Sequence, residues 1–458
     1  MLTTNCVFLE NELLDAARLF KTQPQNITHA FHFENGVFYN AFEIDGEKYA
    51  FEDKANVENE LVFKRLERRF AKLRLYEILS EKYQEKMPWG ALTGIRPTKL
   101  AYSTLEEGGN VEELFQKMHV CEENIRLVQA VLKTQEGIYQ NKNGNTDYFV
   151  SLPFCPSKCA YCSFITAPIE KTRGYLEEYL TCLEKEIEHS KNYIGNLRSV
   201  YVGGGTPFAL DLPHLERVLK SLAPIIKTYN PSAEYTVEAG RPDVFSKEKL
   251  ALLKEYGVTR ICINPQTFSN ETLKKIGRKH TVEDFYTAFE LAQDFGFSVN
   301  IDLIAGLEGE SVESFVSGVE SAVKTGADNI TVHCLSLKSG AKLKEEISYI
   351  ENDFISTMVG ASREILLKNG YLPYYMYRQK YQAGNNENVG WTKPNKACVY
   401  NIDVMEETAD NLAVGANAIS KKVDNESGLI TRLASAKDLP TYLQKIDELL
   451  EKKQNFFK

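Results

Sequence analysis

The sequence lacks any segment typical of a membrane anchor or a secretory leader. No stretch approaches the roughly 20 consecutive apolar residues that a membrane-spanning helix requires. The first 20 residues, MLTTNCVFLENELLDAARLF, have no basic start followed by an apolar run and a small-residue cleavage site. We therefore expect a cytoplasmic protein with no membrane partner.

Concentrated positive charge is also missing. The net charge is −9 at pH 7, and no long block of Lys or Arg interrupts the chain. Phosphate binding requires a concentrated basic surface, so the charge argues against nucleic acid as the main partner. The 458 residues are 43% apolar and 26% charged, the balance of an ordinary globular protein. At roughly 100–200 residues per domain this length predicts several domains.

Cysteine is sparse and mostly scattered. Disulfides are rare in a reducing compartment, so we interpret most of the isolated cysteines as small buried side chains. These are Cys6, Cys121, Cys182, Cys262, Cys334 and Cys398. The other three, Cys155, Cys159 and Cys162, form a C-x3-C-x2-C cluster.

The pattern of elements predicts three parts. Residues 1–145 are expected to form an α+β domain. It has a β-meander over Thr28–Asp53, with turns at Asn35-Gly36 and Asp45-Gly46. Amphipathic helices are expected over 56–86 and 111–140, and Pro97 suits the first turn of a further helix. Residues 146–370 are expected to form the central domain and residues 371–458 a small C-terminal module.

In the central domain, short apolar runs alternate with amphipathic stretches. Strands are expected at Tyr148–Leu152, Ser199–Val202, Glu234–Val237, Arg260–Asn264, Ser298–Leu303 and Asn329–Leu335. Helices are expected at Tyr175–Tyr193, Leu215–Ile226, Lys247–Glu255, Val282–Phe295, Val312–Thr325 and Asp353–Asn369. Repeated strand–helix alternation predicts an α/β fold with a parallel sheet, here a partial (β/α)6 barrel. In such barrels the chemistry gathers at the C-terminal ends of the strands.

The cysteine cluster directly follows the first expected strand. Thiolates at this spacing can ligate a single metal centre. Three ligands to a four-iron cluster leave one iron open, and that iron can chelate the amino and carboxylate groups of S-adenosylmethionine. An electron from the reduced cluster then breaks the sulfonium bond and gives an adenosyl radical, while the protein supplies position and a dry cavity. The alternative is a structural zinc site, which needs four ligands. No fourth Cys or His ligand lies nearby in sequence, and a ligand distant in sequence is the remaining alternative.

Polar or glycine-rich segments follow the later strands. Gly203-Gly204-Gly205-Thr206-Pro207 ends the second strand, and glycines let a backbone approach a ligand closely. Glu238 and Asp302, after the third strand and on the fifth, suit ribose hydroxyls or an ammonium group. Gln266 and Arg278 suit a carboxylate. A helix cap or a surface loop is the alternative for each residue alone. Their order along the barrel favours one shared site.

Together these residues resemble the radical S-adenosylmethionine superfamily. Within it, the sequence is most similar to the oxygen-independent coproporphyrinogen III dehydrogenase family and its HemZ-type branch. The superfamily resemblance depends on Pro153–Cys162, Gly203–Pro207, Glu238, Gln266, Arg278 and Asp302–Leu307. The branch resemblance depends on Leu92–Lys99, Tyr374–Lys380 and Asn388–Gly390.

The resemblance implies two cofactors, a [4Fe–4S] cluster and S-adenosylmethionine. It places the cluster on Cys155, Cys159 and Cys162. The S-adenosylmethionine site would comprise Phe149, Tyr161, Gly204, Gly205, Thr206, Glu238, Gln266, Arg278 and Asp302. The implied reaction is oxidative decarboxylation of two propionates of coproporphyrinogen III to vinyl groups, giving protoporphyrinogen IX, with an electron donor such as a flavodoxin or ferredoxin. A haem-binding chaperone on the same fold and a radical enzyme with another substrate are the alternatives.

Three positions depart from the well-known enzymes of that family. Ser163-Phe164 stand where the family has a further cysteine after one intervening residue. Phe149 replaces a tyrosine, and Ser151 replaces a frequent histidine. A haem-trafficking branch shares Phe at the Phe164 position. These departures leave the reaction open.

A porphyrinogen carries four carboxylates on a broad apolar ring, so its pocket should hold a few cations among aromatic residues. Arg378 is our candidate partner for a propionate, with Tyr377 beside it. Other candidates are Tyr374, Tyr375, Lys380, Trp391 and Lys393. The competing interpretation makes these aromatics the core of the C-terminal module. His333 is interpreted as a barrel histidine with internal partners.

Overall fold

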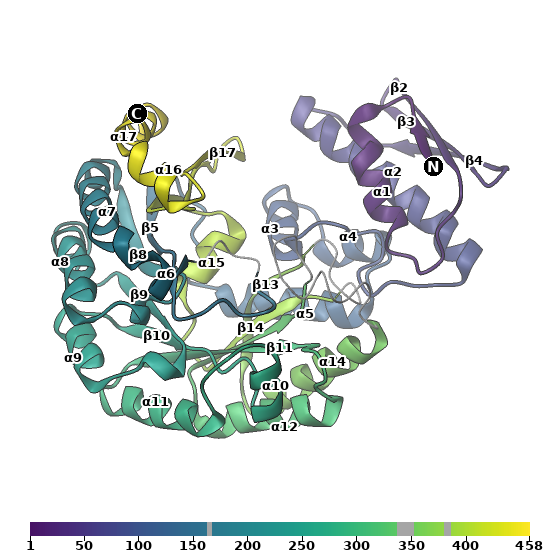
Figure 1. Cartoon of the computed structure of the whole chain (residues 1–458). Coiled ribbons are helices and arrows are strands. Elements are labelled where there is room, and N and C mark those ends of the chain that lie inside the picture. Colours follow the sequence, from purple (N-terminus) through teal and green to yellow (C-terminus); the bar gives the residue numbers. More distant parts are fainter. Residues whose placement is uncertain (163–166, 337–351, 380–385) are drawn as a thin grey trace. The chain divides into compact units, whose positions relative to one another are not determined.

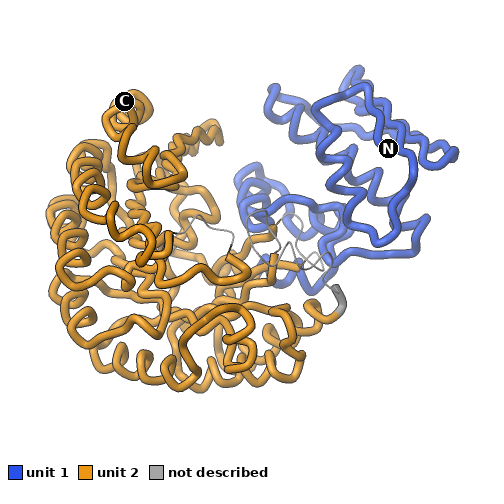
Figure 2. Tube along the Cα trace, viewed as in Figure 1, with its two compact units in different colours: residues 1–129 blue, residues 130–458 orange. Residues whose placement is uncertain are grey.

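The computed structural model describes residues 1–162, 167–336, 352–379 and 386–458. The chain divides into two compact units, residues 1–129 and residues 130–458 (Figure 2). Among the described residues, no helix combines the length and the apolar character needed to cross a membrane.

Unit 1 contains a four-stranded sheet in the order β1-β2-β3-β4. The expected meander is present as three antiparallel strands, and both of its turns have the positive φ angles that Asn-Gly and Asp-Gly adopt in two-residue hairpins. A short parallel strand at the N-terminus, which the sequence did not predict, pairs with β2. The strands are β1 (Leu2–Thr4), β2 (Ile27–Glu34), β3 (Val37–Ile44) and β4 (Glu47–Lys54).

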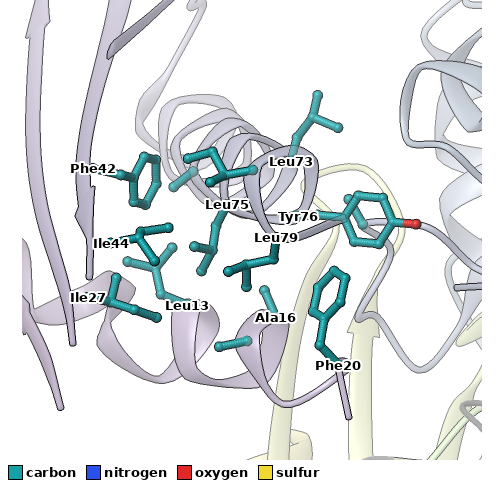
Figure 3. Close-up of a cluster of buried hydrophobic side chains, with 14 of the residues drawn as sticks. Leu13, Ala16, Phe20, Ile27, Phe42, Ile44, Leu73, Leu75, Tyr76 and Leu79 are labelled. Atoms are coloured by element: carbon teal, nitrogen blue, oxygen red, sulfur yellow. The ribbon is translucent and has the colours of Figure 1, made fainter. Parts of the chain in front are cut away.

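Helices α1 and α2 supply the other half of the unit 1 core. Leu13 of α1, Leu75 and Leu79 of α2 and Phe42 of the sheet belong to one buried cluster, and Phe20 lies beside Tyr76 at its other side (Figure 3). The side chain of Asn59 caps α2, and α3 begins at Pro97 as expected. The helices that begin in unit 1 are η1 (Val7–Leu9), α1 (Glu10–Ala17), α2 (Glu60–Tyr83), α3 (Pro97–Glu106), α4 (Val111–Lys117) and α5 (Glu122–Gln135).

Unit 2 is built on an eleven-stranded sheet in the order β13-β14-β12-β11-β10-β9-β8-β5-β15-β16-β17. All six expected barrel strands are present and run parallel to one another. The sheet is not closed, which confirms the partial barrel. These strands are β5 (Asn145–Leu152), β8 (Asn196–Gly204), β9 (Glu234–Gly240), β10 (Arg260–Ile263), β11 (Ser298–Ala305) and β12 (Asn329–Cys334).

One or more helices follow each of these strands, and the long ones line the outer face of the curved sheet (Figure 1). Their buried faces are apolar, as a helix packed on a sheet requires. They are α6 (Ile169–Thr172), α7 (Leu176–Ser190), α8 (Leu212–Tyr229), α9 (Lys247–Glu255), α10 (Asn270–Lys275), α11 (Val282–Asp294), α12 (Val312–Thr325) and α14 (Asn352–Lys368).

The described residues after 370 continue the sheet of unit 2. Strands β13 and β14 extend one edge of the barrel sheet, and β15 adds a further parallel strand beside β5 at the other. Their backbone groups satisfy edges that an isolated barrel would leave unpaired. The boundary between the units also falls within α5, before the turn at Asn141–Asn145. The elements are β13 (Leu372–Tyr377), β14 (Asn388–Thr392), α15 (Val399–Glu406), β15 (Asp410–Val414), β16 (Ile419–Asp424), β17 (Leu429–Ala434), α16 (Leu439–Gln444) and α17 (Ile446–Phe457).

Candidate functional site

The cysteine loop leaves the sheet at the C-terminal end of β5. Its first segment, β6 (Phe154–Cys155), pairs with β7 (Ala167–Pro168), and the amide of Ala167 donates to the carbonyl of Pro153 at 2.7 Å. The two ends of the loop are therefore held together. Its middle is tied to the segment after α10, because the amide of Ala160 donates to the carbonyl of Ile276 at 3.1 Å.

A cavity of about 360 Å³ lies at this end of the strands. Its lining combines the three clustered cysteines with residues at the ends of β8, β9, β11 and β12. The sequence-predicted residues among the lining are Cys155, Cys159, Tyr161, Cys162, Gly204, Gly205, Thr206, Glu238, Gln266, Arg278, Asp302 and Tyr377. Residues distant in sequence thus share one cavity, as the order of motifs along the barrel predicted.

The three thiols lie close enough to influence one another's charge. Burial raises the pKa of the Cys155 thiol to about 11; a hydrogen bond from the Thr206 hydroxyl at 3.5 Å opposes this, and Cys162 and Cys159 raise it further. A bound cationic centre would offset that mutual repulsion, so the donor set fits an iron–sulfur cluster. Among the described residues, no group of three His, Cys, Asp or Glu side chains is arranged to hold a single metal ion.

The glycine loop after β8 lies directly against the cysteine loop. The amide of Gly205 donates to the carbonyl of Leu152 at 2.8 Å, and that of Thr206 donates to Phe154 at 2.7 Å. A Cβ on Gly205 would lie 2.5 Å from the carbonyl oxygen of Phe154, and Gly204 has φ +95°. Side chains at these two positions would push the loops apart.

Arg278 and Gln266 fix the loops that follow β10. The Arg278 guanidinium donates to the Tyr161 hydroxyl at 2.9 Å and to the carbonyl of Asn264 at 3.3 Å. Gln266 has φ +70°, a strained conformation for a side chain of its size. Two backbone hydrogen bonds on either side of Leu303 hold Gln266 there. The Gln266 amide donates to the carbonyl of Asp302 at 3.0 Å, and the amide of Ile304 donates to the Gln266 carbonyl at 2.9 Å.

Glu238 lies in the pocket wall with unusual electrostatics. The Tyr201 hydroxyl donates to it at 2.6 Å. Burial raises the pKa of Glu238 to about 7, the charge of Asp302 adds to this rise, and the bonds from Tyr201 and the Gly204 amide oppose it. Glu238 therefore changes charge near neutral pH.

Asp302 has the opposite environment. Burial would raise its pKa, yet His333 together with Asn300 and Thr331 holds the pKa below the ordinary value. Nε2 of His333 lies 3.7 Å from the Asp302 carboxylate, and Nδ1 lies 3.1 Å from the hydroxyl of Tyr377. His333 thus has internal partners, as expected, but it also lines the pocket.

Two predicted site residues are not among the lining residues. The Phe149 ring stacks with those of Tyr201 and Tyr400, at centroid distances of 6.2 and 6.1 Å. Arg378 is buried near Glu387; burial lowers its pKa to about 9 and Glu387 opposes that fall. Lys380, Ser163 and Phe164 lie outside the described residues.

The other expected substrate residues have structural partners. Tyr374 and Tyr375 belong to a buried cluster with Cys398 and Ile402, as the competing interpretation proposed. Trp391 is also buried, and Lys393 donates to the carbonyl of Gly326 at 2.5 Å.

The sequence reasoning assigned no role to Arg241, which lines the pocket. It follows β9, is 3% exposed, and donates to the Ser157 hydroxyl of the cysteine loop at 2.5 Å and to Asp243 at 2.8 Å. The signal available in the sequence was its place after the third strand.

Comparisons with known proteins agree with this architecture. The sequence model of the Radical SAM superfamily matches residues 149–321. A Bacillus subtilis protein named oxygen-independent coproporphyrinogen-III oxidase-like protein HemZ is 36% identical over 381 residues, covering 80% of this chain and 76% of the relative. The chain belongs to the HemZ family of radical SAM proteins. Its cofactors are therefore a [4Fe–4S] cluster and S-adenosylmethionine.

Other relatives of this HemZ family member are named for different functions. The heme chaperone HemW of Bacillus subtilis is 34% identical over 190 residues, covering 41% of this chain and 49% of that protein. The structure of the Escherichia coli coproporphyrinogen III oxidase HemN, described as a radical SAM enzyme, superposes with a TM-score of 0.54 at 21% identity. The match covers 70% of this chain and 72% of HemN, and at this identity it supports the fold alone.

Proposed function

We propose that this HemZ family protein oxidatively decarboxylates two propionate side chains of coproporphyrinogen III to vinyl groups, giving protoporphyrinogen IX. Each conversion takes –CH2–CH2–COO⁻ to –CH=CH2 with loss of carbon dioxide, one hydrogen atom and one electron. The observation that carries the proposal is the single pocket in which three thiols meet polar residues from successive strand ends. The similarity to HemZ over most of both chains supports the choice of substrate.

We assign the cluster to Cys155, Cys159 and Cys162. When bound and reduced, the cluster supplies the electron that converts S-adenosylmethionine into a radical able to remove a hydrogen atom from the substrate. Arg241 holds the cysteine loop through Ser157, and Thr206 donates to Cys155. The glycine backbone gives close access to the open side of the loop.

The remaining lining residues would bind S-adenosylmethionine. The carboxylates of Glu238 and Asp302 suit its ammonium or ribose hydroxyl groups, and the Gln266 amide donates to the backbone carbonyl of Asp302. Arg278 would act by fixing Tyr161, whose backbone we assign to the adenine. The reaction also needs a one-electron donor, for which a flavodoxin or ferredoxin is the proposed partner, and a one-electron acceptor.

An anaerobic assay tests the reaction. The reconstituted and reduced protein is supplied with S-adenosylmethionine and coproporphyrinogen III, and we expect 5′-deoxyadenosine and carbon dioxide in equal amounts, with protoporphyrinogen IX by mass spectrometry. Cys159→Ala removes one of three cluster ligands and should abolish all three products. Cys398→Ala, a buried cysteine outside the pocket lining, is the matched control and should retain turnover.

A haem chaperone is the second candidate, because the heme chaperone HemW of Bacillus subtilis is 34% identical to this chain over 190 residues. Stoichiometric haem binding without any 5′-deoxyadenosine from coproporphyrinogen III would favour it. Product formation that persists in Cys159→Ala would exclude the radical mechanism.

A further inference from the structure

Three side chains from three strands form a chain of contacts in the pocket wall. Asp302 lies on β11, His333 on β12 and Tyr377 at the end of β13, and all three line the cavity. Nε2 of His333 is 3.7 Å from the carboxylate of Asp302, and Nδ1 is 3.1 Å from the hydroxyl of Tyr377. Asp302 also accepts a hydrogen bond from Asn300 at 2.9 Å. The imidazole is thus held on both sides.

The neighbouring strand β14 is shaped to let β13 contribute to this wall. It lies between β12 and β13, and Gly390 pairs with Thr331 on one side and Tyr375 on the other. A Cβ on Gly390 would lie 1.8 Å from the Tyr375 ring, so only glycine leaves room for that ring. This allows the hydroxyl of Tyr375 to reach Thr331 at 3.4 Å.

Asn388 joins the end of β13 to β12 by hydrogen bonds. Its side chain accepts from the amide of Cys334 at 2.7 Å and donates to the carbonyl of Tyr377 at 3.2 Å. The Asn388–Gly390 motif therefore places the tyrosines of β13 relative to β12. Its position explains why the motif occurs together with the run of tyrosines.

The two described arginines that line the pocket form hydrogen bonds within the protein. The guanidinium of Arg241 is bound by Ser157 and Asp243, and that of Arg278 by Tyr161 and Asn264. Arg378, the sequence-based candidate for a propionate, is not among the residues that line the cavity. Only the buried Nε of Arg278 lacks a partner among the described arginine groups of this wall, so a carboxylate bound elsewhere on it needs another donor.

Tyr377 has the hydrogen-bond arrangement of such a donor. Its oxygen receives a hydrogen bond from Gln379 at 3.4 Å and faces Nδ1 of His333. In the tautomer whose Nδ1–H donates to the Tyr377 oxygen, the phenolic hydrogen is left directed to a ligand. A hydrogen bond to a charged acceptor is stronger than one between neutral groups.

We propose that Tyr377 binds a carboxylate of the tetrapyrrole substrate and that His333 is the positioning residue that orients its hydroxyl. The inference rests on the proposed function for the identity of the substrate. It adds to that function the residue that recognises a propionate and so selects a carboxylated ring.

Equilibrium binding of coproporphyrin III, the stable oxidised form of the ring, tests this without requiring turnover. The full-length protein is reconstituted, S-adenosylmethionine is added, and binding is measured by porphyrin fluorescence for the wild type, Tyr377→Phe and Tyr371→Phe. We expect about tenfold weaker binding for Tyr377→Phe, the loss of one hydrogen bond to a charge. Tyr371→Phe, whose buried hydroxyl donates to Ala327, should bind like the wild type.

The tetramethyl ester of coproporphyrin III separates recognition from structure. It cannot present a carboxylate, so wild type and Tyr377→Phe should bind it equally. If His333 acts through Tyr377, His333→Gln should weaken binding of the free acid, and the double variant should be no weaker than Tyr377→Phe alone.

The outcomes distinguish this inference from the proposed reaction. Equal binding of the free acid by wild type and Tyr377→Phe, or no binding by either, overturns the inference. Tyr377-dependent binding of the free acid in a protein that yields no protoporphyrinogen IX overturns the reaction while the binding residue stands.

Discussion

Glu238 shows how the barrel controls the charge of a single group in the pocket. Its raised pKa, about 7 in the folded protein, means that the folded state keeps a proton that the unfolded state releases above about pH 4.5. The contribution of Glu238 to the free energy of unfolding is therefore complete below about pH 4.5 and is lost as the pH rises to about 7. Because the side chain is only partly enclosed, we take the loss as about 1–2 kcal/mol.

Glu238→Gln removes the ionisation and keeps an acceptor for Tyr201. The melting temperature of the cluster-free variant should match the wild type at pH 5 and exceed it by about 2 °C at pH 8. Glu290→Gln, on the exposed face of α11, is the control and should show no such pH-dependent difference. A difference between Glu238→Gln and wild type that is constant across pH would contradict the assigned pKa.

Some residues of the site can be predicted from the sequence and others cannot. The cysteines and glycines of the site could be predicted because their chemistry and spacing are local. The contacts of His333 with Asp302 and Tyr377 could not, because they depend on the pairing of β11, β12, β14 and β13. The same holds for Arg241, whose partner Ser157 lies 84 residues earlier in the chain.

At the scale of elements, the last helix is anchored by a buried charge. Lys453 of α17 is 1% exposed and lies 2.7 Å from the carboxylate of Glu186 on α7. That carboxylate also accepts from Tyr442 at 2.6 Å and from the amide of Gly415 at 2.7 Å. The pair joins the C-terminal helices to the helix that follows the cysteine loop.

Removing one partner of a buried pair leaves the other charge uncompensated. We expect Lys453→Met to lower the free energy of unfolding of unit 2 by about 3–5 kcal/mol, measured by urea denaturation. Lys452→Met, on the exposed side of the same helix, should change it by less than about 0.5 kcal/mol. Equal effects of the two substitutions would show that the buried pair does not anchor α17.

The elements of the barrel were predictable because buried parallel strands are continuous apolar runs separated by amphipathic helices. The sequence after residue 370 lacks this alternation, so it does not indicate whether the strands there belong to the barrel sheet. In the sequence, Tyr374 and Tyr375 fit the core of a small separate domain equally well. Only the pairing of β13 with β14 places them in the main sheet. Sequence pattern gives the type of an element, whereas its partner depends on contacts between distant segments.

The whole molecule consists of two units with separate cores. The sheet and helices of unit 1 enclose Leu13, Phe20, Phe42, Leu75 and Leu79 within residues 1–129, and the pocket proposed for the cofactors is lined by residues of unit 2. The radical chemistry proposed for this family member therefore belongs to one unit, and unit 1 should fold without it.

A fragment of residues 1–120, ending before α5, tests this independence. It retains β1–β4 and α1–α4, and a core of this size supports folding of a single domain. We expect one cooperative thermal transition by circular dichroism and dispersed amide resonances. An unfolded fragment would mean that the unit 1 core needs residues beyond 120.

If the fragment folds, iron should be absent from it after reconstitution, since Cys6 is its only cysteine. Cluster assembly would then depend on residues 121–458, where all three clustered thiols lie.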